Sequence, residues 1–207
     1  MEKKAKVPKL RFPGFAGDWE ERKLGQVAKF SKGNGYSKDD LIDQGTPIIL
    51  YGRMYTKYQT QINEVDDTFA DKRANAVYST GKEVIVPASG ETAEDISVAS
   101  AVMQPGILLG GDLNIVYPQE KLNSVFLALQ MSNGNAKQEM SRRAQGKSIV
   151  HLHNTDLKEA EVVIPNLDEQ KKITNFFNTL DNLITLHQRK LTHLQTQKKA
   201  LLQQMFV

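Results

Sequence analysis

The feature that most constrains the fold of this chain is an apolar stripe near its C-terminal end. Residues 166–207 contain no glycine or proline. Apolar residues recur there in alternating steps of four and three, the heptad repeat of a helix that faces another helix. His187 and Lys198 are the two positions that interrupt this repeat. The apolar members of the stripe are Ile173, Phe177, Leu180, Ile184, Leu191, Leu194, Leu201 and Met205.

The same region carries a helix start signal. Pro165 ends the segment before it, and Asn166 and Glu169 have the spacing of a capping box. A helix over residues 168–205 would be roughly 55 Å long. This length exceeds the diameter of a domain of roughly 150 residues, so a helix packed on its own domain would leave part of the stripe uncovered. The sequence therefore predicts a partner helix from another chain or from a second copy of this one.

Upstream of this helix the chain has the pattern of short strands separated by glycine and proline. The predicted strand regions are 26–31, 46–52, 75–89, 96–118 and 158–165, and two of them, 75–89 and 96–118, hold two strands each. Helices are expected at 121–133 and in a second short segment that ends at Gly146. The prediction is an α+β fold. We divide it into a basic tail at 1–9, a strand-rich domain at 10–165 and one long helix at 166–207.

Charge is distributed unevenly along the chain. The net charge is +3, but residues 1–11 carry five Lys or Arg against one acid, and residues 166–207 carry six against three. Residues 12–165 therefore have a net charge of −4. Domains that hold nucleic acid by bulk charge are usually basic. Nucleic-acid binding by this region would depend on local clusters, and we expect its affinity to be weak without partners.

The composition also limits the compartment and the chemistry. The chain has no cysteine, which excludes disulfides, thiolate metal sites and a cysteine nucleophile. The basic start is not followed by the apolar run of a signal peptide, and no stretch approaches the ~18 apolar residues of a membrane span. We expect a soluble, cytoplasmic protein.

Motifs of catalysis are incomplete in this sequence. The Gly110-Gly111 pair lacks the Gly-x-Gly and Asn-Pro-Pro patterns of a DNA methyltransferase. Gly146-Lys147-Ser148 resembles the end of a P-loop, but Ser141 stands where that motif requires glycine. A Pro-Asp nuclease motif is absent, and His151 and His153 lack an obvious carboxylate pair for zinc. We expect no catalytic residues and no metal site in this chain.

Four polar loops are the remaining candidates for binding, at residues 32–36, 51–58, 89–92 and 141–148. Arginine can bind the guanine edge with two hydrogen bonds, and Tyr, Thr and Lys commonly contact phosphates. Each loop alone is more simply interpreted as ordinary surface, but four in one domain favour DNA contact. The predicted DNA-contact residues are Tyr36, Arg53, Tyr55, Lys57, Thr92, Arg142, Arg143 and Lys147.

Three segments resemble a known family. They are RFPGFAGDWEERKLGQV near the start, AQGKSIVHLHNTDLKEAEVVIPNLDEQKKI before the long helix, and LDNLITLHQRKLTHLQTQKKALLQQMF within it. Together they resemble the specificity (S) subunit of Type I restriction–modification systems. The most specific part is a strand ending in Ile-Pro, followed by Glu-Gln-x-x-Ile and the long helix. The similarity covers nearly the whole chain, and residues 10–165 correspond to the target recognition domain.

The resemblance implies a role in DNA recognition. In this family, each target recognition domain reads one half of a bipartite sequence in double-stranded DNA, and long helices pair antiparallel as a spacer. Modification (M) subunits dock on the specificity subunit, carry S-adenosylmethionine and methylate adenine, and restriction (R) subunits join them for cleavage. The specificity subunit is not catalytic, and no cofactor is expected in this chain.

The chain departs from the family pattern in one respect. The usual specificity subunit has two recognition domains and two spacer helices, whereas this chain has one of each. It is either a half-subunit or a fragment of a longer protein. A half-subunit is expected to form a homodimer through its long helix and to read an inverted repeat. The alternative is a coiled-coil interaction adaptor that does not bind DNA.

Overall fold

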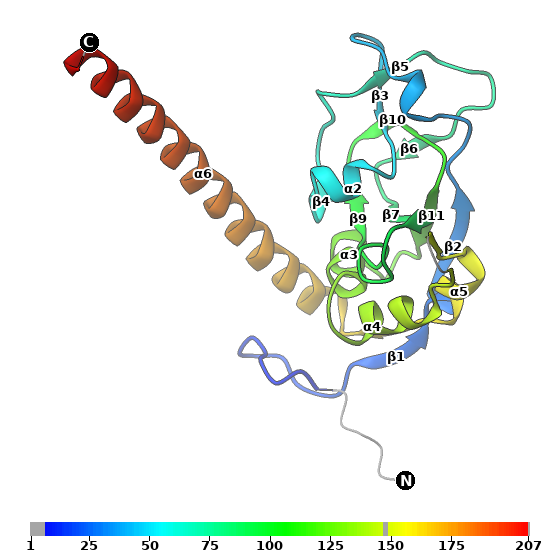
Figure 1. Ribbon diagram of the computed structural model, residues 1–207. Helices are drawn as coiled ribbons and strands as arrows, with labels where there is room; N and C mark the ends of the chain where they lie inside the picture. Colours follow the sequence, from blue (N-terminus) through cyan, green and yellow to red (C-terminus); the bar gives the residue numbers. More distant parts are fainter. Residues whose placement is uncertain (1–6, 147–148, 207) are drawn as a thin grey trace. The chain divides into compact units, whose positions relative to one another are not determined.

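The computed structural model describes residues 7–146 and 149–206 and confirms the predicted α+β class with a long C-terminal helix. The chain divides into two compact units, with the boundary between Lys171 and Lys172. The first unit contains all the strands and the shorter helices, and the second contains most of the long helix α6, Leu167–Met205 (Figure 1).

Two sheets form the centre of the first unit. The five-stranded sheet has the order β2 (Ala28–Lys32), β11 (Leu113–Pro118), β7 (Val84–Pro87), β9 (Ser100–Val102) and β4 (Gln61–Ile62). The four-stranded sheet has the order β5 (Phe69–Ala70), β3 (Thr46–Ile49), β10 (Pro105–Leu109) and β6 (Tyr78–Thr80). Neighbouring strands are antiparallel except for the pairs β4–β9 and β3–β10, which are parallel.

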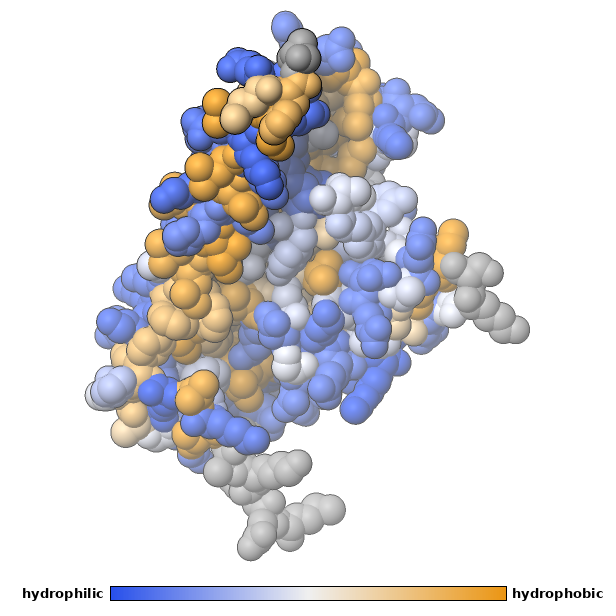
Figure 2. Space-filling view, turned by 60° about the vertical axis from the view of Figure 1, so that its left-hand side comes forward, coloured by the Kyte–Doolittle hydropathy of each residue, from blue (hydrophilic) through white to orange (hydrophobic). Residues whose placement is uncertain are grey.

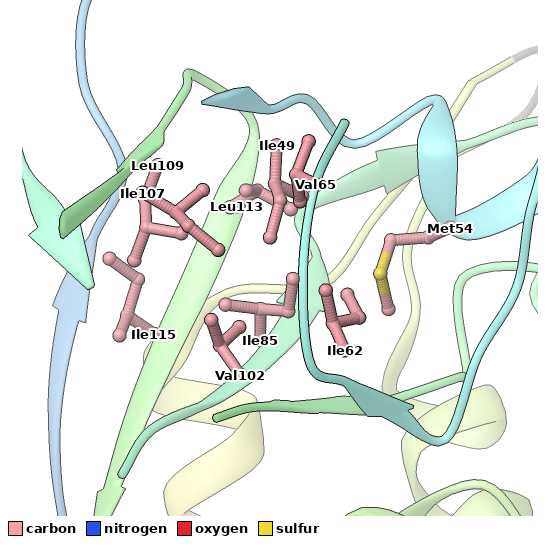
Figure 3. Packing of buried hydrophobic residues seen from close by; sticks show 10 residues of the cluster. All are labelled: Ile49, Met54, Ile62, Val65, Ile85, Val102, Ile107, Leu109, Leu113 and Ile115. Atoms are coloured by element: carbon pink, nitrogen blue, oxygen red, sulfur yellow. The ribbon is translucent and has the colours of Figure 1, made fainter. Parts of the chain in front are cut away.

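The core lies between these sheets and is formed by side chains from both of them. Because side chains alternate between the two faces of a strand, every second residue of a strand points into this core. Ile49 of β3 and Ile107 and Leu109 of β10 pack with residues of the five-stranded sheet such as Ile85 and Ile115 (Figure 3). The intervening residues Ile48 and Leu108 face the other way, into a smaller cluster with Tyr36 and Ala70. Both faces of the four-stranded sheet are therefore covered.

Short elements complete the first unit. Two further strand pairs join distant parts of the chain: β1 (Glu20–Lys23) with β13 (Glu161–Ile164), and β8 (Ser89–Gly90) with β12 (Val150–His151). The helices are α1 (Leu24–Val27), η1 (Lys38–Asp40), α2 (Arg53–Thr56), α3 (Ser124–Met131), α4 (Gly134–Arg143) and α5 (Asn154–Glu159). The sequence had indicated α3 and α4. It did not indicate α1, α2 and α5, which have four to six residues and are too short to show helical periodicity.

The first turn of α6 is built into the first unit. Asn166 caps the helix as predicted, since its Oδ1 accepts a hydrogen bond of 2.9 Å from the Glu169 amide. The Glu169 carboxylate accepts two hydrogen bonds of 2.7 Å from Arg11, through Nε and Nη2. Gln170 is fully buried; its side chain donates to the carbonyls of Lys121 and Pro165 and accepts from the Asn123 amide at 2.8 Å. These contacts tie the root of α6 to the N-terminal segment and to the start of α3.

The rest of α6 presents an apolar stripe to solvent. With 39 residues the helix is roughly 58 Å long. Figure 2 shows hydrophobic side chains gathered along it. The stripe residues Leu180, Ile184, Leu191, Leu194, Leu201 and Met205 are between 38% and 73% exposed. A heptad stripe of this extent is typical of a helix that pairs with another. None of the helices in residues 7–146 and 149–206 is both long and apolar enough to cross a membrane.

Candidate nucleic-acid interface

Two adjoining hollows on the first unit form one groove. Their volumes are about 840 and 1320 Å³, and both are lined by Lys38, Tyr51, Gly52, Thr56 and Asp112. The groove is bordered by the loop that leads into η1, by α2, and by β8 with the loop that follows it. Segments that are far apart in the sequence thus meet at one concave surface, as binding loops on a rigid scaffold commonly do.

Helix α2 carries the central wall of this groove. Met54 extends from α2 into the core cluster, which anchors the short helix (Figure 3). The ring of Tyr55 on α2 and that of Tyr51, which precedes the helix, meet edge to face, with centroids 6.1 Å apart. Both rings are partly exposed and line the groove. Aromatic rings in this position offer flat, amphipathic contact area and a hydroxyl for hydrogen bonding.

The two cations of this segment are held by one carboxylate. Arg53 is only 8% exposed, and its Nη1 donates to Asp67. Lys57 Nζ donates to the other oxygen of Asp67 at 2.7 Å. Burial by itself would raise the pKa of Asp67, but the hydrogen bonds and charges of Lys57 and Arg53 outweigh it and hold the pKa below its ordinary value. Asp67 is therefore ionised at neutral pH and fixes both cations against the groove wall.

Two tyrosines of the groove, Tyr55 and Tyr58, form hydrogen bonds through their hydroxyl groups. Tyr55 donates to the Ser89 carbonyl at 2.7 Å, which joins α2 to β8. Burial raises the pKa of Tyr55, so its hydroxyl remains protonated at neutral pH. Tyr58 donates to Ser132 Oγ at 3.0 Å. These contacts hold the side chains of Tyr55 and Tyr58 in the wall of the groove.

Asp112 lies where the two hollows meet. Its φ of 57° is the one positive value among the described non-glycine residues. Its carboxylate accepts from Ser89 Oγ at 2.9 Å, and its carbonyl accepts from the Ala88 amide at 2.7 Å. Left-handed conformations of this kind are tolerated by aspartate and concentrate at functional sites. The sequence signal for this conformation is the Gly-Gly-Asp turn at 110–112.

The groove carries more acidic than basic groups. Its cations are Lys38, Arg53, Lys57 and Lys137. Its carboxylates are those of Asp40, Asp67, Glu91, Glu94, Asp95 and Asp112. A surface of this composition does not attract phosphates by bulk charge. Carboxylates and tyrosine hydroxyls are instead suited to the donor and acceptor atoms of base edges.

The structure brings together part of the predicted contact set. Tyr36, Arg53, Tyr55 and Lys57 all line the groove. Tyr36 is buried, donates to the Asp71 carbonyl at 2.8 Å, and lies under the Arg73 guanidinium, which is 4.6 Å from its ring centre. Tyr36 and Arg53 therefore support the groove from within, while Tyr55 and Lys57 reach its surface.

The other predicted residues lie at different places. Thr92 is in the loop after β8, and its hydroxyl donates to Asp95 at 2.6 Å. Arg142 and Arg143 are on α4; Arg142 is exposed beside a separate hollow, and Arg143 is 4.0 Å from Glu139. Lys147 is outside the described residues. Tyr51 and Asp112, which were not among the predicted contacts, line both hollows of the groove.

No group of three or more His, Cys, Asp or Glu side chains within 7–146 and 149–206 is placed to hold a metal ion. The His151 and His153 rings are parallel, with centroids 6.2 Å apart.

Comparison with known proteins identifies the family. The model of the Type I restriction modification DNA specificity domain matches residues 16–196. The chain belongs to this family. The matched family is a DNA specificity family rather than a family of enzymes. The family membership confirms the resemblance of the three sequence segments to this group.

One relative is the Type I restriction enzyme MjaVIII specificity subunit of Methanocaldococcus jannaschii. It is 21% identical over 193 residues, which are 89% of this chain and 44% of the relative. The chain therefore spans less than half the length of this relative.

Solved structures share the fold. The S subunit of a Type I restriction–modification system from M. genitalium aligns with a TM-score of 0.60 and 16% identity, over 85% of this chain and 42% of that one. A chain from a study of the assembly and conformational transition of the type I R-M system aligns with a TM-score of 0.61 and 14% identity. The alignment covers 91% of this chain and 45% of that one. The HsdS subunit from Thermoanaerobacter tengcongensis aligns with a TM-score of 0.53 and 13% identity, over 89% of this chain and 42% of that one.

Proposed function

We propose that the first unit reads one half of a bipartite sequence in double-stranded DNA and that α6 sets the distance to the second half. The observation that carries this proposal is the groove wall, where Tyr55 of α2 meets Tyr51 just before this helix, and Met54 anchors the helix in the core. A wall fixed in this way can discriminate between base edges, since its donors and acceptors do not rearrange on binding.

Base contacts are assigned to the groove and phosphate contacts to its surroundings. Tyr51, Tyr55 and the carboxylates of the Thr92 loop face base edges, where a carboxylate can accept from the amino group of cytosine. Lys57 at the groove surface and Arg142 on α4 are suited to phosphates, as are Arg143 and Lys147. Arg53 and Tyr36 position the loops that make these contacts.

The family and the net charge of −4 on residues 12–165 support the proposal of further partners. A recognition domain with a net negative charge binds DNA weakly alone, so partners must supply much of the phosphate contact. We assign this role to methyltransferase (M) subunits that dock on the chain and bind S-adenosylmethionine, with restriction (R) subunits added for cleavage. The complex acts in the cytoplasm, and two copies of this chain form its recognition core through α6.

A binding selection tests the proposal. The chain is co-purified with its M subunit, and the complex is used to select from random DNA duplexes. We expect the selected pool to contain a defined bipartite sequence, and the double variant Tyr51→Ala/Tyr55→Ala to lose this selection while it still co-purifies with the M subunit. A pool without any sequence preference would contradict DNA reading and favour a coiled-coil adaptor.

A further inference from the structure

The two polar residues that interrupt the apolar stripe on α6 restrict which helix can pair with it. His187 and Lys198 are exposed and occupy core positions of the heptad repeat. A polar side chain at such a position sets the register of a coiled coil, because facing an apolar residue would bury it without a partner. A suitable partner helix must therefore present polar groups opposite both of these residues.

A second copy of the same helix meets this requirement in one arrangement. In an antiparallel pair, each core residue faces the residue equally far on the other side of the two-fold axis. With the axis between Thr192 and His193, His187 faces Lys198 of the other copy, and Lys198 faces His187. All the other pairs are apolar: Leu180 with Met205, Ile184 with Leu201, and Leu191 with Leu194.

We infer that two copies of this chain pair antiparallel through α6 in this register, with the axis between Thr192 and His193. The inference rests on the proposed function, because it specifies how the two recognition domains are joined. The neutral imidazole of histidine can accept a hydrogen bond from the lysine ammonium group, so both interruptions are partnered.

Other arrangements leave the interruptions unpartnered. A parallel pair sets Lys198 against its own copy, and like charges repel. An antiparallel pair shifted by one heptad toward the domain sets His187 against Leu191 and Lys198 against Leu180. The same shift brings Lys190 beside its own copy near the axis. A shift in the other direction shortens the overlap and sets Lys198 against Leu194.

The register determines a distance that matters for the target. At ~1.5 Å per residue, the two copies of Lys172, where the second unit begins, lie roughly 60 Å apart along the coil. A shift by one heptad changes this separation by ~10 Å, which is about three base pairs of DNA. The register of α6 therefore sets the number of base pairs between the two half-sites.

Disulfide cross-linking tests the register in the full chain, which has no cysteine of its own. Chains with Ile184→Cys are mixed with differently tagged chains with Leu201→Cys, and the oxidised mixture is separated by mass. We expect a cross-linked heterodimer, because these positions face each other. The matched control mixes Ile184→Cys with Leu194→Cys, which lie about one heptad out of register and are too far apart to bridge.

A charge substitution gives an independent readout. His187→Glu creates two Glu–Lys pairs in the inferred register, and we expect the dimer Kd measured by sedimentation to fall roughly threefold to tenfold. In the register shifted toward the domain, the same carboxylate would face Leu191 and weaken the dimer. The double variant His187→Glu/Lys198→Glu sets carboxylates against each other and is expected to raise the Kd above that of the native chain.

The outcomes separate this inference from the proposed function. If the control pair forms the cross-link and the Ile184→Cys and Leu201→Cys pair does not, the inferred register is wrong. The homodimer itself would still be supported by that result. A chain that is monomeric at micromolar concentration would overturn pairing with a second copy and assign the stripe to another protein. Sequence-selective DNA binding by the complex with the M subunit would still support DNA reading in either case.

Discussion

Asp67 determines the position of two predicted contact residues, because it accepts hydrogen bonds from both Arg53 and Lys57. Neutralising it with Asp67→Asn leaves the buried Arg53 without its counter-charge. We expect a loss of about 1–2 kcal/mol in the free energy of unfolding measured with urea. Asp66→Asn is the matched control, since Asp66 is more exposed and lies 3.8 Å from Lys57. Equal effects of the two substitutions would contradict a special role for Asp67.

The same carboxylate predicts a pH dependence of stability. The pKa of Asp67 in the folded state lies below its ordinary value of 3.8. The ionised group therefore stabilises the fold above pH ~4, and this contribution is lost as the pH falls through the folded-state pKa. We expect the difference in unfolding free energy between the native chain and Asp67→Asn to be largest near pH 7 and to shrink toward pH 3. A difference that grows with acidification would have the wrong sign.

Base-reading and phosphate-contacting residues are expected to fail in different ways. Arg53→Ala loosens the wall that carries Tyr51 and Tyr55, so the complex with the M subunit should lose discrimination between related sequences. Arg142→Ala removes an exposed cation and should weaken binding to all sequences alike, with a decrease of about 1 in the slope of log K against log salt. Competition titrations at several salt concentrations measure both effects, and the reverse pattern would exchange the two roles.

At the scale of elements, the sequence predicted the helices and strands whose hydrophobic pattern repeats over many residues. Helix α6 was expected over 168–205 and is observed over Leu167–Met205, because the heptad pattern extends through it. The strand predicted at 158–165 is shorter, since α5 occupies Asn154–Glu159 and β13 begins at Glu161. A helix of six residues gives too few turns for its period to be recognised.

The candidate site was less predictable because it depends on tertiary pairing. Nothing near Arg53 in the sequence indicates that its charge would be buried against Asp67, fourteen residues later. The groove brings together α2, the Thr92 loop and Asp112. To predict this grouping, one would need to know the order of the strands in both sheets. Residue types predicted polar binding loops, but only the fold shows which of them face the same surface.

Pairing through α6 is expected to be sensitive to charge on the stripe. Ile184→Glu places a carboxylate at a core position and should convert the homodimer to monomer at micromolar concentration, as measured by sedimentation. Thr185→Glu is the matched control, because it adds the same charge at the next residue, outside the heptad positions. A dimer that survives Ile184→Glu unchanged would place the interface elsewhere.

At the scale of the whole molecule, one recognition domain and one long helix make up a chain less than half as long as its curated relative. Symmetric pairing of two such chains would give two equal reading surfaces in opposite orientations. The corresponding DNA target is an inverted repeat, whereas two different recognition domains would read an asymmetric sequence.

Mapping of methylated adenines in cells that produce this chain together with its M subunit tests this account most directly. We expect methylation at a single bipartite motif whose halves are inverted copies of each other, separated by a fixed number of base pairs. The motif should disappear when this chain is omitted. Methylation that is unchanged without the chain, or that follows no bipartite sequence, would contradict the account.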